Sequence, residues 1–201
     1  MGGGVPTGTI YHYDGSEWEA QYTKRPGGIR DIWGTSGQDV FAVITAPHSS
    51  GEGSGGLVLH YDGSIWTPIS AETTQSLYGV WGSSGTDVFV VGEGVTLHYG
   101  LDGWATSNTI GGWSVWGSSS NDVYAVGYGG SVMHYDGVAW NPITAYDWDT
   151  DLRVWGRSSS DVYIAGEGGF LVHYDGSTWT RIETWKVAGG DGYEPHFLDM
   201  T

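Results

Sequence analysis

Residues 116–140, WGSSSNDVYAVGYGGSVMHYDGVAW, contain the pattern that decides the fold. Its first half is Trp-Gly followed, six residues after the Trp, by Asp-Val and an aromatic residue, and it occurs at Trp33, Trp81, Trp116 and Trp155. Its second half is His-Tyr with a Trp six residues after the His, and it occurs at His12, His60, His98, His134 and His173. Successive histidines are 36 to 48 residues apart, a period typical of a four-stranded unit.

Each unit is predicted to be one antiparallel sheet, whose strands we call A to D in chain order. Runs rich in Val, Ile, Tyr, Phe and Trp alternate with Gly-Ser-Ser and Asp-Gly-Ser segments, which favour tight turns. Strand C is apolar on both faces, as expected for a sheet covered on both sides by neighbouring sheets. The sequence therefore predicts an all-β, single-domain β-propeller over residues 1–201, with C and D strands at 9–20, blades at about 29–70, 77–108, 112–145 and 152–184, and a tail at 185–201.

The blade count depends on how the two ends of the repeat array meet. The spacing of the repeat predicts a strand A near residue 194, which would join the C and D strands of residues 9–20 in a composite fifth blade. The alternatives are a fragment of a larger propeller and a homo-oligomer that completes the ring, because an unpaired sheet edge promotes association.

The pattern at 116–140 resembles the bacterial propeller repeats grouped with the BNR (Asp-box) and photosystem II assembly-factor superfamily. The most specific similarity is Asp-Gly-Ser-Thr-Trp at 175–179, which is similar to the Asp-box hairpin between strands C and D. His173 stands where the Asp-box has Ser, and one residue between Asp175 and Gly176 is missing. The resemblance implies a propeller fold. It implies no particular activity, because propellers include lectins, glycosidases and scaffolds.

The composition excludes several classes of partner. The 201 residues contain 23 acidic and seven basic side chains, a net charge of −16 that would repel nucleic acid and anionic membrane surfaces. No apolar run approaches the ~18 residues of a membrane span. With no Cys, disulfides and thiolate metal sites are absent. The resemblance and the acidic, lysine-poor composition favour a soluble protein in an extracellular or periplasmic location.

Residues present in every unit are best explained by folding. We expect the repeated His side chains to hydrogen-bond a turn Asp or the backbone within the core, not to form a metal site, because metal ligands must converge to within about 2 Å of the ion. The Asp of each Asp-Val pair is expected to cap a turn, and the Trp of each Trp-Gly pair to pack between blades.

Residues that do not repeat indicate function. The A–B and C–D loops share one face and are nearly invariant. Almost all variation falls in the B–C and D–A loops of the opposite face, which we call the variable face. Aromatic rings there suit the apolar faces of a sugar, with carboxylates as acceptors for its hydroxyl groups; the same residue types suit a protein hot spot. The predicted function is a non-catalytic binding module for a glycan, or alternatively an interaction scaffold for a surface protein, with candidate contacts at Tyr128, Tyr146, Asp147, Trp148, Asp149, Arg153, Trp185 and Tyr193.

Two further hypotheses concern carboxylates. Glu93 and Glu167 follow strand B in two blades, and a pair separated by ~5 to 9 Å would suit a glycosidase. Asp147, Asp149 and Asp151 alternate along the chain and could present oxygens to Ca²⁺, although the Gly and distal Glu of an EF-hand loop are missing. No cofactor is expected otherwise.

Overall fold

The computed structural model describes residues 8–23, 28–45, 55–71, 73–107, 111–145, 151–167 and 169–182. They form one two-stranded and four four-stranded antiparallel sheets. The strands are β1 (Ile10–Tyr13), β2 (Trp18–Tyr22), β3 (Ile29–Ser36), β4 (Asp39–Ile44), β5 (Leu57–Tyr61), β6 (Trp66–Ile69), β7 (Leu77–Ser84), β8 (Asp87–Gly92), β9 (Val95–Gly100), β10 (Gly103–Ser107), β11 (Ser114–Ser119), β12 (Asp122–Val126), β13 (Ser131–Tyr135), β14 (Trp140–Ala145), β15 (Arg153–Ser158), β16 (Asp161–Gly166), β17 (Phe170–Tyr174) and β18 (Trp179–Arg181).

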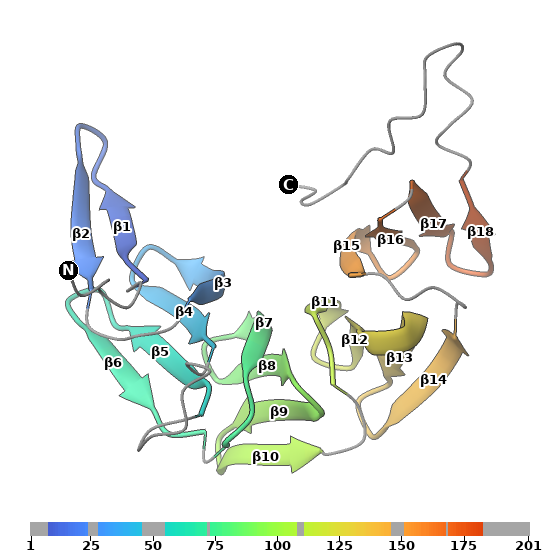
Figure 1. Ribbon diagram of the computed structural model, residues 1–201, viewed down its shortest axis with the longest axis horizontal. Helices are drawn as coiled ribbons and strands as arrows, with labels where there is room; N and C mark the ends of the chain where they lie inside the picture. The colour runs from blue at the N-terminus through green and yellow to red at the C-terminus, as the bar shows by residue number, and fades with distance from the viewer. Residues whose placement is uncertain are drawn as a thin grey trace, which may run out of the picture.

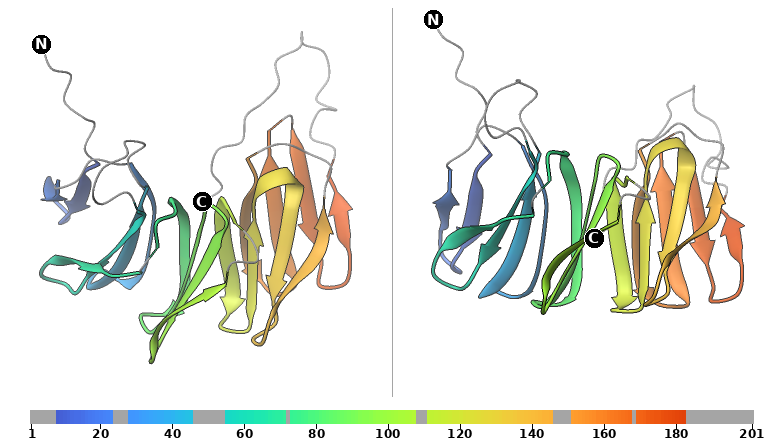
Figure 2. Two further views of the ribbon diagram at one scale, coloured as in Figure 1. Left: turned by 60° about the horizontal axis from the view of Figure 1, so that its bottom comes forward. Right: turned by 90° about the horizontal axis from the view of Figure 1, so that it is seen from below.

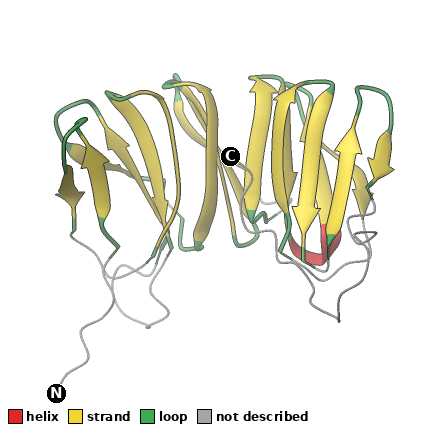
Figure 3. Ribbon diagram, turned by 90° about the horizontal axis from the view of Figure 1, so that it is seen from above, coloured by secondary structure: helices red, strands yellow, loops and turns green. Residues whose placement is uncertain are grey.

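The sheets are arranged as the blades of a β-propeller, which confirms the predicted fold class. Strands A of the four complete blades, β3, β7, β11 and β15, lie side by side on the inside, and the other strands of each blade follow outward in chain order (Figure 1). The blades pack face to face when seen from the side (Figure 2). The A–B and C–D turns lie at one end of the strands and the other connections at the opposite end (Figure 3).

The described blades form an arc that begins at β1–β2 and ends at β15–β18 (Figure 1). The sheet β1–β2 corresponds to strands C and D alone, as the sequence predicts. The predicted strand A near residue 194 lies outside the described residues, so closure by the C-terminal tail stays a prediction. Among the described residues the helical structure is one short turn, η1 (Tyr128–Gly130), and no helix there is long and apolar enough to cross a membrane.

Neighbouring blades are joined by the Trp of one and the Gly of the next. A Cβ atom added at Gly82 would lie 2.7 Å from the ring of Trp33, and one added at Gly117 would lie 2.7 Å from the ring of Trp81. Trp116 covers Gly156 in the same way, at 2.6 Å. Only glycine leaves room for an indole at this distance, so the Trp-Gly pair sets the spacing between blades. This confirms the predicted packing role of Trp33, Trp81 and Trp116.

Around these contacts, each core cluster is built from two neighbouring sheets. Phe41, Phe89 and Phe170 are among the fully buried side chains. Each such side chain contributes about 1.5 to 3 kcal/mol by leaving water. Most of the stabilising burial therefore lies between blades, so that each blade depends on its neighbours.

Within each complete blade, the repeated His and Asp form a hydrogen bond. The Nε2–Oδ1 distances are 2.7 Å for His60–Asp39, 2.6 Å for His98–Asp87, 2.7 Å for His134–Asp122 and 2.8 Å for His173–Asp161. Each Asp follows the A–B turn; partial burial raises the pKa of Asp39, but hydrogen bonds from Thr35 and His60 outweigh this effect and lower it. The bond ties strand C to the A–B turn, which confirms a structural role for these histidines.

We predict that Asp122→Ala lowers the free energy of unfolding by about 1 to 3 kcal/mol, because His134 and Ser118 both lose their acceptor in a partly buried setting. Chemical denaturation monitored by Trp fluorescence measures the change. Asp102→Ala is the control, since Asp102 is exposed in the turn between β9 and β10. Equal stability of the two variants would contradict a structural role for the His–Asp pair.

Candidate binding site at the centre of the propeller

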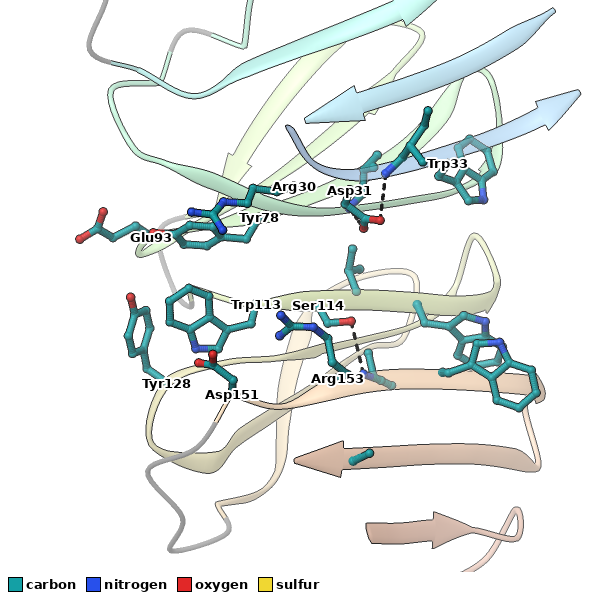
Figure 4. Close-up of a pocket in the computed structure, with 17 residues that line it drawn as sticks. Arg30, Asp31, Trp33, Tyr78, Glu93, Trp113, Ser114, Tyr128, Asp151 and Arg153 are labelled. Carbon is teal, nitrogen blue, oxygen red and sulfur yellow. Dashed lines mark hydrogen bonds between the residues drawn. The ribbon is translucent and has the colours of Figure 1, made fainter. Parts of the chain in front are cut away.

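A pocket of about 710 Å³ lies between the inner strands β3, β7, β11 and β15, and we call it the central pocket. Residues at the start of these strands and in the B–C loops form the end that opens on the variable face, and Trp rings of the repeat lie at the other end (Figure 4). The side chains that line the pocket include Arg30, Asp31, Trp33, Tyr78, Glu93, Trp113, Ser114, Trp116, Tyr128, Asp151, Arg153 and Trp155.

Three aromatic rings form a row at the open end, which we call the aromatic row. The ring centroids of Tyr78 and Trp113 are 4.5 Å apart, and those of Trp113 and Tyr128 are also 4.5 Å apart. Tyr78 belongs to β7, Trp113 directly precedes β11, and Tyr128 begins η1. In η1, Gly129 and Gly130 have φ values of +62° and +71°, a conformation that favours glycine and allows the tight turn that presents Tyr128. Tyr128 is 52% exposed and therefore accessible to a ligand.

Both signs of charge lie beside the aromatic row. Arg30 and Arg153 come from the first residues of β3 and β15, and Glu93 and Asp151 from the B–C and D–A connections. None of these four side chains forms an ion pair within 4.0 Å among the described residues. Desolvation, followed by the influence of Tyr78 and the charges of Glu93 and Asp151, raises the pKa of the Tyr128 phenol. The open end of the pocket thus offers both hydrogen-bond donors and acceptors.

Two hydrogen bonds between blades hold the inner strands in register beside this site. The Asp31 carboxylate accepts a hydrogen bond from the backbone N–H of Val80 at 2.9 Å, and the Ser114 hydroxyl accepts one from the N–H of Val154 at 3.3 Å. Both are drawn in Figure 4. Because each bond joins two blades, the pocket wall is fixed by the same contacts that hold the propeller together.

The structure places two of the eight predicted ligand contacts, Arg153 and Tyr128, in the lining of the central pocket. The other six, Tyr146, Asp147, Trp148, Asp149, Trp185 and Tyr193, lie outside the described residues.

Each of the two predicted carboxylate sites has one residue in the lining of the central pocket and its other residues elsewhere. Glu93 lines the central pocket, whereas Glu167, its counterpart in the hypothetical glycosidase pair, is not among the lining residues. Asp151 lines the pocket, and its predicted Ca²⁺ partners Asp147 and Asp149 lie outside the described residues. Within the described ranges, no group of three His, Cys, Asp or Glu side chains is arranged to hold a metal ion.

Sequence reasoning missed Arg30, Asp31, Tyr78 and Ser114, which lie on the inner strands and not in loops. Trp113, which directly precedes β11, was also not among the predicted contacts. A signal for all five was present. The residue before each repeated Trp is always Ile or Val, but the residues two and three before it differ in every blade: Asp31 and Arg30, Gly79 and Tyr78, Ser114 and Trp113, Arg153 and Leu152.

The comparisons with known proteins support the fold. No protein-family model and no curated protein sequence matches the chain. A solved structure of YCF48 bound to a D1 peptide matches with a TM-score of 0.61 and 18% identity, over 83% of this chain and 58% of that one. YCF48 from Cyanidioschyzon merolae matches with a TM-score of 0.61 and 17% identity, over 83% and 63%. The chain thus spans about three fifths of the length of the YCF48 chains.

A weaker match is the six-bladed β-propeller lectin of Aleuria aurantia, which recognises fucose: the TM-score is 0.46 and the identity 13%, over 90% of this chain and 67% of that one. A similarity of this strength carries no information about ligands. Together with the sheet topology, the YCF48 structures show that the chain is a β-propeller protein.

We predict that Glu93→Gln lowers the pKa of Tyr128 toward that of an ordinary tyrosine, because the negative charge of Glu93 disfavours the tyrosinate. NMR titration of the ¹³C-labelled phenol carbon measures the pKa. Glu167→Gln is the control and leaves the pKa unchanged. An unchanged pKa in Glu93→Gln would show that Glu93 does not act on the aromatic row.

Proposed function

We propose that the protein is a non-catalytic glycan-binding module whose ligand enters the central pocket from the variable face. The observation that carries the proposal is the aromatic row, Tyr78, Trp113 and Tyr128, with the carboxylates of Glu93 and Asp151 beside it. Flat apolar rings lie next to carboxylate acceptors that form no ion pair within the described part of the chain, and the two match the two kinds of surface on a sugar.

The chemistry of the pocket fits a carbohydrate in detail. The C–H face of a pyranose packs on the exposed ring of Tyr128, a contact of the kind worth about 0.5 to 1.5 kcal/mol beyond area burial. Its hydroxyl groups donate to Glu93 and Asp151 and accept from Arg30 and Arg153. The volume of about 710 Å³ lies within the range of roughly 300 to 1,000 Å³ that is usual for small-ligand sites.

The predicted contacts that lie outside the described residues are also proposed to bind the glycan. Tyr146, Asp147, Trp148 and Asp149 lie two to five residues before Asp151 in the sequence, in the same connection as this pocket residue. Trp185 and Tyr193 remain proposed contacts on the variable face. A glycan ligand also agrees with the proposed extracellular or periplasmic location.

Two other functions would use the same residues. A peptide of a surface protein could bind the aromatic row as a hot spot, because Trp, Tyr and Arg are enriched at such sites. A glycosidase would need a second carboxylate opposite Glu93, and the proposed partner Glu167 does not line the pocket. Peptide and glycan arrays distinguish the first from a glycan-binding module, and turnover of aryl glycosides tests the second.

We predict that the protein binds a defined subset of an array of neutral and acidic glycans, and that Tyr128→Ala weakens that binding about tenfold, the equivalent of about 1.4 kcal/mol. Trp18→Ala is the matched control, because Trp18 is also an exposed aromatic residue but lies on β2, away from the pocket. Trp148→Ala and Trp185→Ala test the outer contacts. If the folded protein bound no glycan on the array but bound selectively to a peptide array, the ligand would be a peptide and the glycan proposal would be wrong.

We predict no release of a chromogenic aglycone from aryl glycosides by the wild-type protein. Turnover that is lost in both Glu93→Gln and Glu167→Gln would instead identify a glycosidase. Trp18→Ala again serves as the control, since it changes neither carboxylate.

A further inference from the structure

A second pocket, of about 380 Å³, lies between the blade β7–β10 and the blade β11–β14, and we call it the side pocket. Strands β9 and β10 form one wall, and the turn between β13 and β14 with its flanking rings Tyr135 and Trp140 forms the other. The ring centroid of Phe89 lies 5.4 Å from that of Tyr135 and 6.2 Å from that of Trp140. The side pocket shares no lining residue with the central pocket, so it is a separate feature of the molecule.

The side pocket exists because three repeat positions of the blade β7–β10 differ from those of the other complete blades. Two residues before the repeated His, the other blades have Val, Val and Leu, whereas this blade has Thr96. Three residues after the Trp of strand D, the others have Ile and this blade has Ser107. Directly after that Trp, the others have Thr, Asn and Thr, and this blade has Ala105. All three residues line the side pocket.

The equivalent space between the other complete blades is filled by apolar side chains. Val58 and Val132 are buried in their core clusters, with Ile69 and Ile143 packed against them. Thr96 is only 3% exposed, and burying its hydroxyl group costs free energy that a Val would not cost. Residues that break a local rule at a cost in stability are typical of functional sites. The substitutions that open the side pocket therefore indicate a binding site.

Strand β10 beside this pocket is the outermost strand of its blade (Figure 1), and it lacks the features that protect the other outermost strands. Sheet edges are usually protected by proline, by charged side chains or by bulges. Strands β6 and β14 contain Pro68 and Pro142, β2 contains Glu19, and β18 contains Arg181. Strand β10, with the sequence Gly-Trp-Ala-Thr-Ser, contains neither proline nor charge and pairs with β9 over five residues without a bulge.

Thr106 stands at the repeat position that is Pro68 in β6 and Pro142 in β14, two residues after the strand D Trp. Because proline has no N–H, the pairing with strand C does not use a donor at this position, and the N–H of Thr106 points to the outer edge. The neighbouring residues Ala105 and Ser107 line the side pocket. Since side chains alternate along a strand, every second residue of a strand added to β10 would project into the same pocket.

We infer that the β10 edge and the side pocket together bind an extended peptide segment of a partner protein, with a tyrosine in the pocket and basic residues on either side. Main-chain hydrogen bonds to β10 give the affinity, and the pocket gives the specificity. The proposal does not depend on the glycan site.

The lining of the side pocket favours tyrosine over other side chains. The rings of Phe89, Tyr135 and Trp140 suit a further aromatic ring. The hydroxyl groups of Thr96 and Ser107 each donate one hydrogen bond and accept two, so each can also serve a phenol. The lining contains no Asp, Glu, Lys or Arg, which fits a neutral side chain. Outside the pocket, the net charge of −16 attracts a basic segment and repels an acidic one.

The test uses fluorescent peptides of the form KTVTXTVTK, in which X is tyrosine, phenylalanine or serine, with the intact 201-residue protein. We expect saturable binding of the tyrosine peptide in fluorescence anisotropy, and protection of the Thr106 amide in hydrogen exchange. The phenylalanine peptide binds roughly fivefold more weakly because it lacks one hydrogen bond, and the serine peptide binds more weakly still.

Two variants separate the edge from the pocket. Thr106→Pro removes the outward N–H, as β6 and β14 do naturally, and weakens binding about tenfold. Ala20→Pro is the matched control, because it makes the same kind of change at the equivalent position of β2, and it binds the peptide as the wild type does. Thr96→Val combined with Ser107→Ile gives the pocket the residues of the blade β3–β6. It weakens binding of the tyrosine peptide and raises the melting temperature by about 2 to 4 °C, which shows that the variant is folded.

Three results would overturn the proposal. Equal binding of the tyrosine and serine peptides would show that the side pocket is not used. Full binding by Thr106→Pro would place the peptide elsewhere, for example on the aromatic row. If the folded protein bound none of the three peptides, the β10 edge would not accept a strand, and saturable binding of free p-cresol in that case would assign the side pocket to a small molecule. None of these results bears on glycan binding, which is measured with Tyr128→Ala.

Discussion

The contact between a Trp ring and the Gly of the next blade determines how the sheets are arranged. An indole at 2.6 to 2.7 Å from the position of a glycine Cβ fills the space that a side chain would otherwise need, so the inner strands approach closely and at a constant offset. The His–Asp bond then ties the outer strand C to the A–B turn of the same blade. The Trp–Gly pair therefore acts between blades and the His–Asp pair within them. Both pairs recur because every blade must pack on its neighbour and hold its own strands together.

A regular scaffold leaves other positions free to vary. In three of the four blades the residue before the Trp is a Val that packs against the neighbouring blade, and Val80, Val115 and Val154 are almost fully buried there. Most of the residues two and three before the Trp line the central pocket, and they differ from blade to blade while the Trp–Gly contact is kept. Arginine, tyrosine, tryptophan and carboxylate side chains therefore meet in one pocket on a scaffold whose other repeated positions are almost uniform.

The local and periodic features of the structure could be predicted from the sequence. The features that depend on distances between blades could not. The strand order, the turns and the His–Asp pairs follow from spacing alone, because hydrogen bonds within a blade join residues of one repeat. The spacing does not predict that Tyr78, Trp113 and Tyr128 lie next to one another, because these rings come from two blades and from a strand and two connections. Variation between repeats was taken as informative and assigned to loops, and the inner-strand positions Arg30 and Asp31 were overlooked.

The charge distribution limits the kind of ligand that the central pocket favours. With a net charge of −16, the protein repels anions at long range, although Arg30 and Arg153 attract an anionic group once it is inside. Screening restricts the long-range field to about 10 Å at 0.1 M salt, so an anionic ligand would associate faster as salt rises. A neutral sugar crosses this field without cost and still finds donors and acceptors beside an apolar surface. The acidic surface therefore favours a neutral sugar over an anionic one.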